Sequence, residues 1–140
     1  MSEKFKILTQ FVKDMSSETP DVETYLYVKE YLKNYNLNID ITTKPLKNRM
    51  IEVNTKLCYI DKGKVKNKSH FEITYASIIK IDEQIKDRKI IEKIILCDVQ
   101  KEIYPNLEKV FMNLLSNSGF PGIKFEKKVD FEQLYNQRLN

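Results

Sequence analysis

Residues Met50–Asp61 read MIEVNTKLCYID, and after a lysine-rich segment residues His70–Ile81 read HFEITYASIIKI. Apolar side chains recur at every second position in both stretches, and this spacing places them on one face of a β-strand. The connection Asp61–Lys64 contains residues that favour turns. We therefore predict a β-hairpin with one apolar face.

Two segments upstream of this hairpin also alternate. Phe5–Lys13 places Phe5, Ile7 and Phe11 at positions of one parity, which indicates a strand with these three side chains on one face. Leu37–Thr42 alternates strictly between apolar and polar side chains. Both segments are therefore predicted to be strands of the same sheet.

Helical spacing begins after the hairpin. Isoleucines in 90–95 indicate a short helix before Asp98. A longer helix is predicted from Pro105, in its first turn, to Gly119, because apolar residues between them recur at i, i+3, i+4 and i+7. A last apolar stripe follows Asp130, a suitable N-cap. Three helices are therefore expected in the second half of the chain.

Four strands followed by helices indicate an α+β fold, in which a four-stranded antiparallel sheet has helices packed on one face. The segment 22–35 fits neither period and is expected to be a crossover with some helix. A length of 140 residues suits one domain spanning 1–140. A small domain with surplus apolar surface is expected to join a copy of itself or bind a partner.

The chemical inventory argues against an enzyme. The chain has one histidine, two cysteines without a CxxC spacing and three glycines, so paired-imidazole sites, zinc-finger patterns and glycine-rich phosphate loops are excluded. Cys97 and His70 could form a thiol–imidazole pair, but cysteine more often behaves as a small buried apolar residue. We predict no catalytic residues, no metal and no cofactor.

The net charge of +4 comes mainly from lysine. Lys62, Lys64, Lys66 and Lys68 cluster in the hairpin loop, where clustered cations could neutralise nucleic-acid phosphates. The cluster lacks interleaved aromatic side chains, so we favour a solvated loop and no nucleic-acid partner, and a nucleic-acid-binding module stays the alternative. Without a membrane-length apolar run or a signal-peptide pattern, we expect a soluble cytoplasmic protein that does not insert into membranes.

Short motifs along the chain occur in the order of a known family. Val12–Pro20, VKDMSSETP, resembles a Y-x-K-D-x-S-x-E-x-P signature, and Tyr104–Pro105 followed by Gly119–Pro121 resembles the frame of a long helix. Val129–Tyr135, VDFEQLY, is similar to a C-terminal helix motif. Together these segments resemble the SecB family of protein-export chaperones. One departure is Asn106–Glu108, where that family usually has an aromatic residue, alanine and arginine.

The resemblance implies an ATP-independent holdase that binds unfolded secretory preproteins in extended apolar grooves. It also implies delivery of these preproteins to the translocase motor SecA, and assembly into a homotetramer built as a dimer of dimers. A SecB-like chaperone with a different client, such as an antitoxin, is the closest alternative.

The resemblance further implies a role for particular residues. The group expected to bind SecA consists of Asp14, Glu18, His70 and Glu72. The walls of the client groove are expected to include Leu37, Ile39, Ile41, Phe131, Leu134, Tyr135 and Leu139. The apolar stripe expected at the oligomer interface, and also on the chain's own sheet, consists of Leu107, Val110, Phe111, Leu114 and Leu115.

Overall fold

The computed structural model describes residues 4–123, 125 and 129–138. Its strands form one antiparallel sheet in the order β1-β4-β3-β2. The strands are β1 Phe5–Glu18, β2 Tyr35–Pro45, β3 Met50–Asp61 and β4 His70–Ile81. The predicted bounds of β3 and β4 are confirmed, whereas β1 and β2 are longer than predicted.

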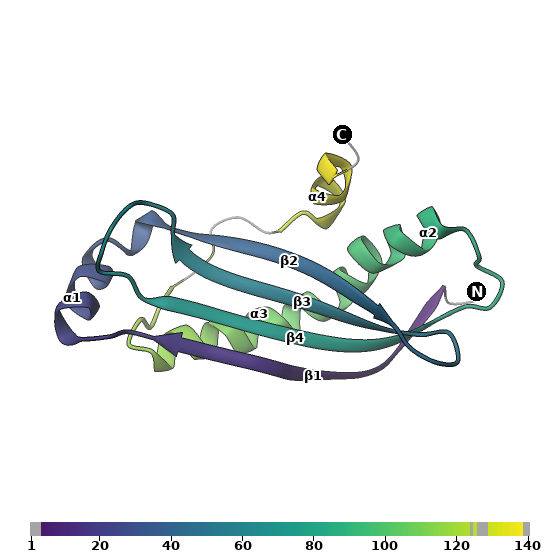
Figure 1. The fold of residues 1–140 in the computed structure, drawn as a ribbon, viewed down its shortest axis with the longest axis horizontal. Coiled ribbons are helices and arrows are strands. Elements are labelled where there is room, and N and C mark those ends of the chain that lie inside the picture. Colours follow the sequence, from purple (N-terminus) through teal and green to yellow (C-terminus); the bar gives the residue numbers. More distant parts are fainter. Residues whose placement is uncertain (1–3, 124, 126–128, 139–140) are drawn as a thin grey trace.

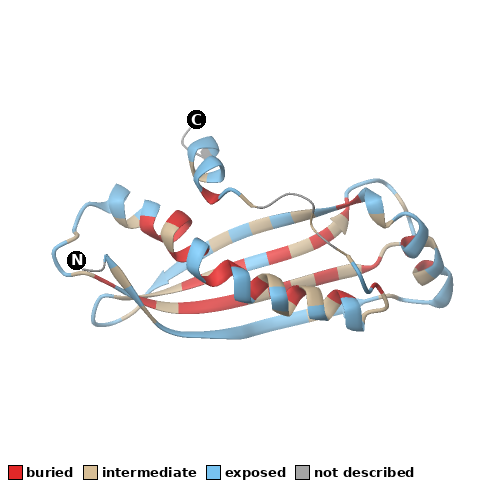
Figure 2. Ribbon diagram, turned by 180° about the vertical axis from the view of Figure 1, so that it is seen from behind, coloured by how far each residue is buried: buried red, intermediate tan, exposed pale blue. Residues whose placement is uncertain are grey.

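The helices lie at one end of the sheet and across one of its faces. They are α1 Val22–Glu30, the 3₁₀ helix η1 Leu32–Asn34, α2 Arg88–Lys93, the π-helix η2 Ile94–Val99, α3 Gln100–Asn117 and α4 Phe131–Arg138. The helices α1 and η1 connect β1 to β2 at the end of the sheet (Figure 1), and α3 runs across one face (Figure 2). The predicted α+β fold, with an antiparallel sheet and helices on one face, is confirmed.

The helices α2, η2 and α3 follow one another without a break. The junction residues Ile94 (φ −57°, ψ −48°) and Val99 (φ −62°, ψ −45°) keep right-handed helical dihedral angles. The prediction of two separate helices was therefore wrong, and Pro105 lies inside α3 rather than in its first turn. Pro105 is tolerated there although proline donates no backbone hydrogen bond, because the residue is exposed.

A buried glutamine links the π-helix to the sheet. The Gln100 side chain is fully buried, accepts a hydrogen bond from Thr55 Oγ1 of β3 at 2.9 Å and donates one to the Ile95 carbonyl at 3.3 Å. A buried polar group without such partners would be costly, so this pair of bonds favours one position of η2 over the sheet.

Two β-bulges in β1 change the direction of its side chains. The register with β4 shifts around Leu8 and around Lys13, each of which is an extra residue in the ladder. Phe5 and Ile7 therefore face the helix-covered side, whereas Phe11 lies on the other face and is 45% exposed. The prediction that these three side chains share a face was wrong, because simple alternation does not count an inserted residue.

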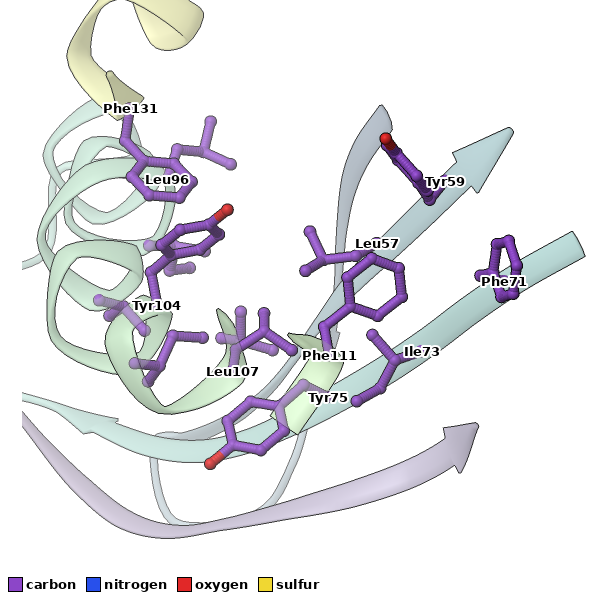
Figure 3. Close-up of a cluster of buried hydrophobic side chains, with 14 of the residues drawn as sticks. Leu57, Tyr59, Phe71, Ile73, Tyr75, Leu96, Tyr104, Leu107, Phe111 and Phe131 are labelled. Atoms are coloured by element: carbon purple, nitrogen blue, oxygen red, sulfur yellow. The ribbon is translucent and has the colours of Figure 1, made fainter. Parts of the chain in front are cut away.

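The core lies between α3 and the sheet. Leu107 and Phe111 of α3 point toward Leu57 of β3 and Ile73 of β4, and all four side chains are fully buried (Figure 3). Burying one large apolar side chain contributes about 1.5–3 kcal/mol. The chain's own sheet therefore holds α3 in place.

The apolar stripe predicted on α3 divides between two environments. Leu107, Phe111 and Leu115 are fully buried within the chain, whereas Val110 and Leu114 are half-buried at the edge of the core. A side chain already buried against its own sheet has no surface left for a neighbour. Any contact between copies of the chain through this stripe must therefore use Val110 and Leu114.

A glycine with left-handed backbone follows α3. Gly119 has φ +101°, and a Cβ there would lie 2.6 Å from Cε1 of Tyr25, whose hydroxyl donates to the Gly119 carbonyl at 2.8 Å. We expect Gly119→Ala to lower the free energy of unfolding by about 1–3 kcal/mol, measured by urea denaturation. Gly122 is the matched control, because it has φ +83° but no atom within 4 Å of an added Cβ. Equal losses in the two variants would contradict the role of the Tyr25 contact.

Candidate functional site

The edge strand β2 has apolar side chains that the helices cover only in part. Leu37, Ile39 and Ile41 are half-buried and belong to the rim of the core. They face the same side of the sheet as α3, but α3 packs against β4 and reaches β1, at the opposite edge. An apolar strip is thereby left along β2.

Adjoining hollows follow this strip. One of about 920 Å³ shares Ile39 and Leu134 with a second of about 450 Å³. The second shares Ile41 and Leu96 with a third of about 360 Å³. Because consecutive hollows share wall residues, they form one groove, which we call the β2 groove. The strand has 11 residues, so a groove along its whole length spans roughly 35 Å at about 3.3 Å per residue.

The β2 groove has one wall from the sheet and one from helices. Apolar side chains of the sheet wall are Leu37, Ile39, Ile41, Pro45, Ile51 and Tyr59. Apolar side chains of the helical wall, from α2, η2 and α4, are Ile91, Ile95, Leu96, Phe131, Leu134 and Tyr135. Charged groups such as Lys33 and Arg88 lie near the ends of the groove. The middle hollow is lined by apolar side chains from both walls together with the polar side chains of Asp40 and Gln137.

The structure brings most of the predicted groove residues together. Those that line the hollows are Leu37, Ile39, Ile41, Phe131, Leu134 and Tyr135. Leu139 lies outside the described residues. The contribution of Ile91, Ile95 and Leu96 was missed, because the spacing of the isoleucines in 90–95 indicated only a short helix. Their place in the groove follows from the course of η2.

Contacts with η2 and α3 hold α4 in the helical wall. Phe131 is 4% exposed, and its ring meets that of Tyr104 edge-on with centroids 5.3 Å apart. Cys97 Sγ donates to the Phe131 carbonyl at 3.7 Å, and Lys101 Nζ lies 2.7 Å from Glu132 Oε1. Apolar packing thus fixes the start of α4, and an exposed ion pair supports it.

The ion pair between Lys101 and Glu132 makes part of this packing pH-dependent. The hydrogen bond from Lys101 lowers the pKa of Glu132. Because folding lowers this pKa, the pair stabilises the fold at pH values above the unfolded-state pKa of about 4.3. This contribution is lost as the pH falls through the lower pKa of the folded state. Because both groups are exposed, the effect on stability is small and is screened by salt.

We expect Lys101→Met to move the pKa of Glu132 back up toward its usual value. The measurement is an NMR titration of the Glu132 carboxyl carbon. Lys109→Met, which removes another exposed lysine of α3, is the control and should leave this pKa unchanged. The same pKa of Glu132 in all three proteins would show that the ion pair does not form in solution.

The sheet face away from α3, which we call the open face, carries the second predicted group. Pairing in the sheet places Glu18 opposite His70 and Asp14 opposite Thr74, and Glu72 lies on the same face of β4. All four predicted residues of the SecA group therefore share one face of two adjacent strands. In Figure 1 this face looks toward the reader, with α3 behind the sheet.

Lysines on the open face neutralise part of its negative charge. Lys56 Nζ lies 3.1 Å from Glu72 Oε1, and Lys13 Nζ lies 2.7 Å from Glu52 Oε2. His70 Nε2 is 3.6 Å from the same Glu72 oxygen. The open face is therefore of mixed charge rather than uniformly acidic, and a basic partner must compete with Lys56 for Glu72.

The cysteine near His70 is Cys58. Cys58 lies on β3 directly opposite Glu72, on the open face. Burial raises the pKa of its thiol, with a further contribution from the Glu72 charge. Cys97 is instead buried in η2 beneath Phe131. The Cys97–His70 pair considered from the sequence is therefore not formed.

An antiparallel sheet with an apolar groove along one edge and a polar open face defines a protein that offers binding surfaces. None of the described helices is long and apolar enough to cross a membrane. The whole chain, residues 1–140, matches the family model of SecB, the preprotein translocase subunit. The chain therefore belongs to the SecB family, whose members are chaperones of protein export.

Relatives in other organisms agree with this assignment. The chain is 58% identical over 140 residues, 100% of both chains, to a putative protein-export protein SecB of Pelagibacter ubique. It is 26% identical over 137 residues, 96% of this chain and 79% of the relative, to the protein-export protein SecB of Parvibaculum lavamentivorans.

A solved structure shows the same fold at low identity. The SecB-like chaperone of Mycobacterium tuberculosis, solved in complex with a peptide from an antitoxin, aligns with a TM-score of 0.61 and 10% identity. The alignment covers 89% of this chain and 91% of that one. At this identity the likeness concerns the fold alone.

Proposed function

We propose that this chain holds unfolded secretory preproteins in the β2 groove without ATP and delivers them to SecA for export. The observation that carries the proposal is the continuity of the groove, whose hollows share Ile39, Ile41, Leu96 and Leu134. An extended polypeptide advances about 3.3 Å per residue, so roughly ten residues fit along β2. Groove length and apolar walls together suit an unfolded chain.

Many shallow contacts would supply the affinity. Apolar burial contributes about 25 cal/mol per Å², and ordering of the client offsets much of this gain. β2 pairs with β3 on one side only among the described residues, so its other edge could also form main-chain hydrogen bonds with an extended client. Such contacts select exposed apolar segments rather than a sequence motif, and folded proteins do not present such segments.

A slow-folding preprotein diluted from denaturant provides the test. We expect the chain to delay its folding and to suppress aggregation, followed by light scattering, with no ATP present. The same protein after folding should not bind, because its apolar segments are buried. Aggregation at an unchanged rate with the chain in excess would rule the proposal out.

The open face is the proposed site for SecA. Asp14, Glu18, His70 and Glu72 lie together there and would contact the basic C-terminal tail of SecA. We expect the double variant Asp14→Ala, Glu72→Ala to weaken binding of a SecA tail peptide by about tenfold, since charge-assisted hydrogen bonds are among the stronger polar contacts. Asp40→Ala, which removes an exposed carboxylate of β2 from the same face, is the control.

Other results, from this peptide titration or from oligonucleotide binding, favour other functions. No binding, or binding that the double variant does not change, favours the SecB-like chaperone with a client such as an antitoxin. Tight oligonucleotide binding that falls with salt, and is lost when the lysines of the loop are neutralised, favours the nucleic-acid module. The lysines concerned are Lys62, Lys64, Lys66 and Lys68.

The β1 edge of the sheet, opposite the β2 groove, supports assembly of several copies. Asn106 Nδ2 of α3 donates to the Tyr75 hydroxyl of β4 at 2.6 Å, and the Ser118 hydroxyl is 2.7 Å from that of Ser17 in β1. Val110 and Leu114 occupy the same i, i+4 row as Asn106 and Ser118, so they lie along the β1 side of α3.

Exposed side chains of β1 extend this apolar strip. Val12 and Met15, which face the α3 side of the sheet, are 40% and 46% exposed. A second copy paired along β1 would cover them and would also form hydrogen bonds with the edge of β1 that faces away from β4. This arrangement would form the dimer from which the proposed homotetramer, a dimer of dimers, is built.

Light scattering of the purified protein tests the assembly. We expect the mass of a tetramer, and a smaller species for Met15→Glu and for Leu114→Glu, because each variant places a charge in the proposed interface. Asn113→Glu, at an exposed position of α3, should keep the original mass. The mass of one subunit at micromolar concentration would contradict the proposed assembly.

A further inference from the structure

Cys58, His70 and Glu72 converge on the open face, and the strand register explains why. Cys58 is the cross-strand partner of Glu72, and His70 precedes Glu72 by one alternation of β4, so all three side chains share one face. One donor atom from each residue, a thiol sulfur, an imidazole nitrogen and a carboxylate oxygen, lies within 4.8 Å of the other two.

Although the sequence pattern predicted no metal, we propose that Cys58, His70 and Glu72 form a binding site for Zn²⁺. Zinc binds thiolate, imidazole and carboxylate ligands in tetrahedral geometry at about 2.0–2.3 Å, which separates the ligand atoms by about 3.5 Å. His70 Nε2 and Glu72 Oε1 are already 3.6 Å apart. The Cys58 sulfur lies within 4.8 Å of both of these atoms, and rotation of its side chain would bring it to the spacing that zinc requires.

The donor set determines which metal suits the site. Thiolate and imidazole suit Zn²⁺ and similar ions, whereas Mg²⁺ and Ca²⁺ prefer sites made of oxygen. Three protein ligands leave a fourth position for water or for a donor from another molecule. All three residues are half-buried, so an ion can enter from solvent while the sheet holds its ligands in place.

Lys56 competes with the ion for Glu72. Its ammonium lies 3.1 Å from Glu72 Oε1, and its side chain is 45% exposed. An exposed ion pair of this kind contributes little stability, so a divalent ion can displace it. When Zn²⁺ binds, the Cys58 thiol loses its proton to the buffer and the thiolate takes its place as ligand.

A titration of the reduced, intact chain with Co²⁺, followed by competition with Zn²⁺, tests the site. Any histidine tag is removed first, because His70 is the single histidine of the chain. We expect one ion per chain, a thiolate-to-cobalt charge-transfer absorption, and its loss when Zn²⁺ is added. Cys58→Ser should abolish the absorption and weaken Zn²⁺ binding by at least about 100-fold, beyond the roughly 10- to 100-fold cost of losing an outer partner of a metal site.

Further variants separate the zinc site from nearby features. Lys56→Met should tighten Zn²⁺ binding by roughly five- to tenfold, because it removes a unit charge close to the ion. Cys97→Ser removes the other cysteine and should leave both absorption and affinity unchanged. Asp14→Ala should also leave them unchanged, so failure of the SecA proposal would not affect this one.

Either of two results would overturn the proposed zinc site. It is overturned if the wild-type chain shows no thiolate absorption with Co²⁺ and no Zn²⁺ binding tighter than millimolar. It is also overturned if the absorption persists in Cys58→Ser. Circular dichroism of Cys58→Ser establishes that this variant is folded, and His70→Gln, which leaves the thiol in place, should independently weaken the binding of Zn²⁺.

Discussion

Replacing Ile39 by aspartate is expected to weaken the binding of an unfolded preprotein by about 100-fold. Ile39 lines two of the hollows that make up the β2 groove. The change removes apolar contact worth up to about 1.5–3 kcal/mol and adds a carboxylate that must lose water when a client covers it. Each 1.4 kcal/mol or so corresponds to about a tenfold change in affinity. Fluorescence anisotropy of a labelled, unfolded preprotein measures the effect.

A position on the other face of β2 provides the matched control. Thr42 is on the same strand but faces the open side of the sheet and lines none of the hollows of the groove, so Thr42→Asp introduces the same carboxylate outside the groove. Leu134→Asp repeats the test from the helical wall, where the native side chain is 43% exposed and its replacement carries little risk for folding. Similar affinities for Ile39→Asp and Thr42→Asp, in folded proteins, would place the client elsewhere.

Truncation of Phe111 should have the largest effect on stability. Its side chain is fully buried between α3 and the sheet, against Leu57 and Ile73 (Figure 3). We expect Phe111→Ala to lower the free energy of unfolding by about 3–5 kcal/mol, because the lost apolar burial adds to the cost of the cavity left behind. Urea denaturation followed by circular dichroism measures the loss.

A control on the same helix separates a core role from an interface role. Asn113 is exposed on α3, so Asn113→Ala should change stability by less than about 0.5 kcal/mol. If Phe111 instead served mainly a subunit interface, Phe111→Ala would dissociate the assembly and leave each protomer with its native stability. Unfolding midpoints measured at several protein concentrations distinguish the two cases.

The hairpin strands could be predicted to the residue, whereas β1 could not. In β3 and β4 the alternation is unbroken and a polar loop separates the strands. In β1, the strand was predicted to end at Lys13, but Ser16 and Ser17 remain paired with β4, because hydrogen bonding across the sheet overrides the weak strand preference of serine. The extra residues Leu8 and Lys13 are bulges, which depend on the partner strand and leave no signal in alternation.

The candidate site was predictable only where it depends on local pattern. The apolar face of β2 follows from its alternation, and the apolar stripe of α4 follows from helical spacing. The wall formed by Ile95 and Leu96 depends on the π-helix, which changes the helical period that a sequence pattern assumes. The approach of Cys58 to His70 depends on the register across the long loop between β3 and β4, which no short turn motif fixes.

Amide hydrogen exchange along β2, with and without a bound unfolded preprotein, tests most directly whether clients occupy this groove. Only one edge of β2 is paired with β3, so the amides pointing away from β3 report on a client laid along the strand. If clients occupy the β2 groove, these amides and the amides of α4 exchange more slowly when preprotein is bound. Preprotein that binds stoichiometrically while exchange in 35–45 and 131–138 stays unchanged would contradict the account.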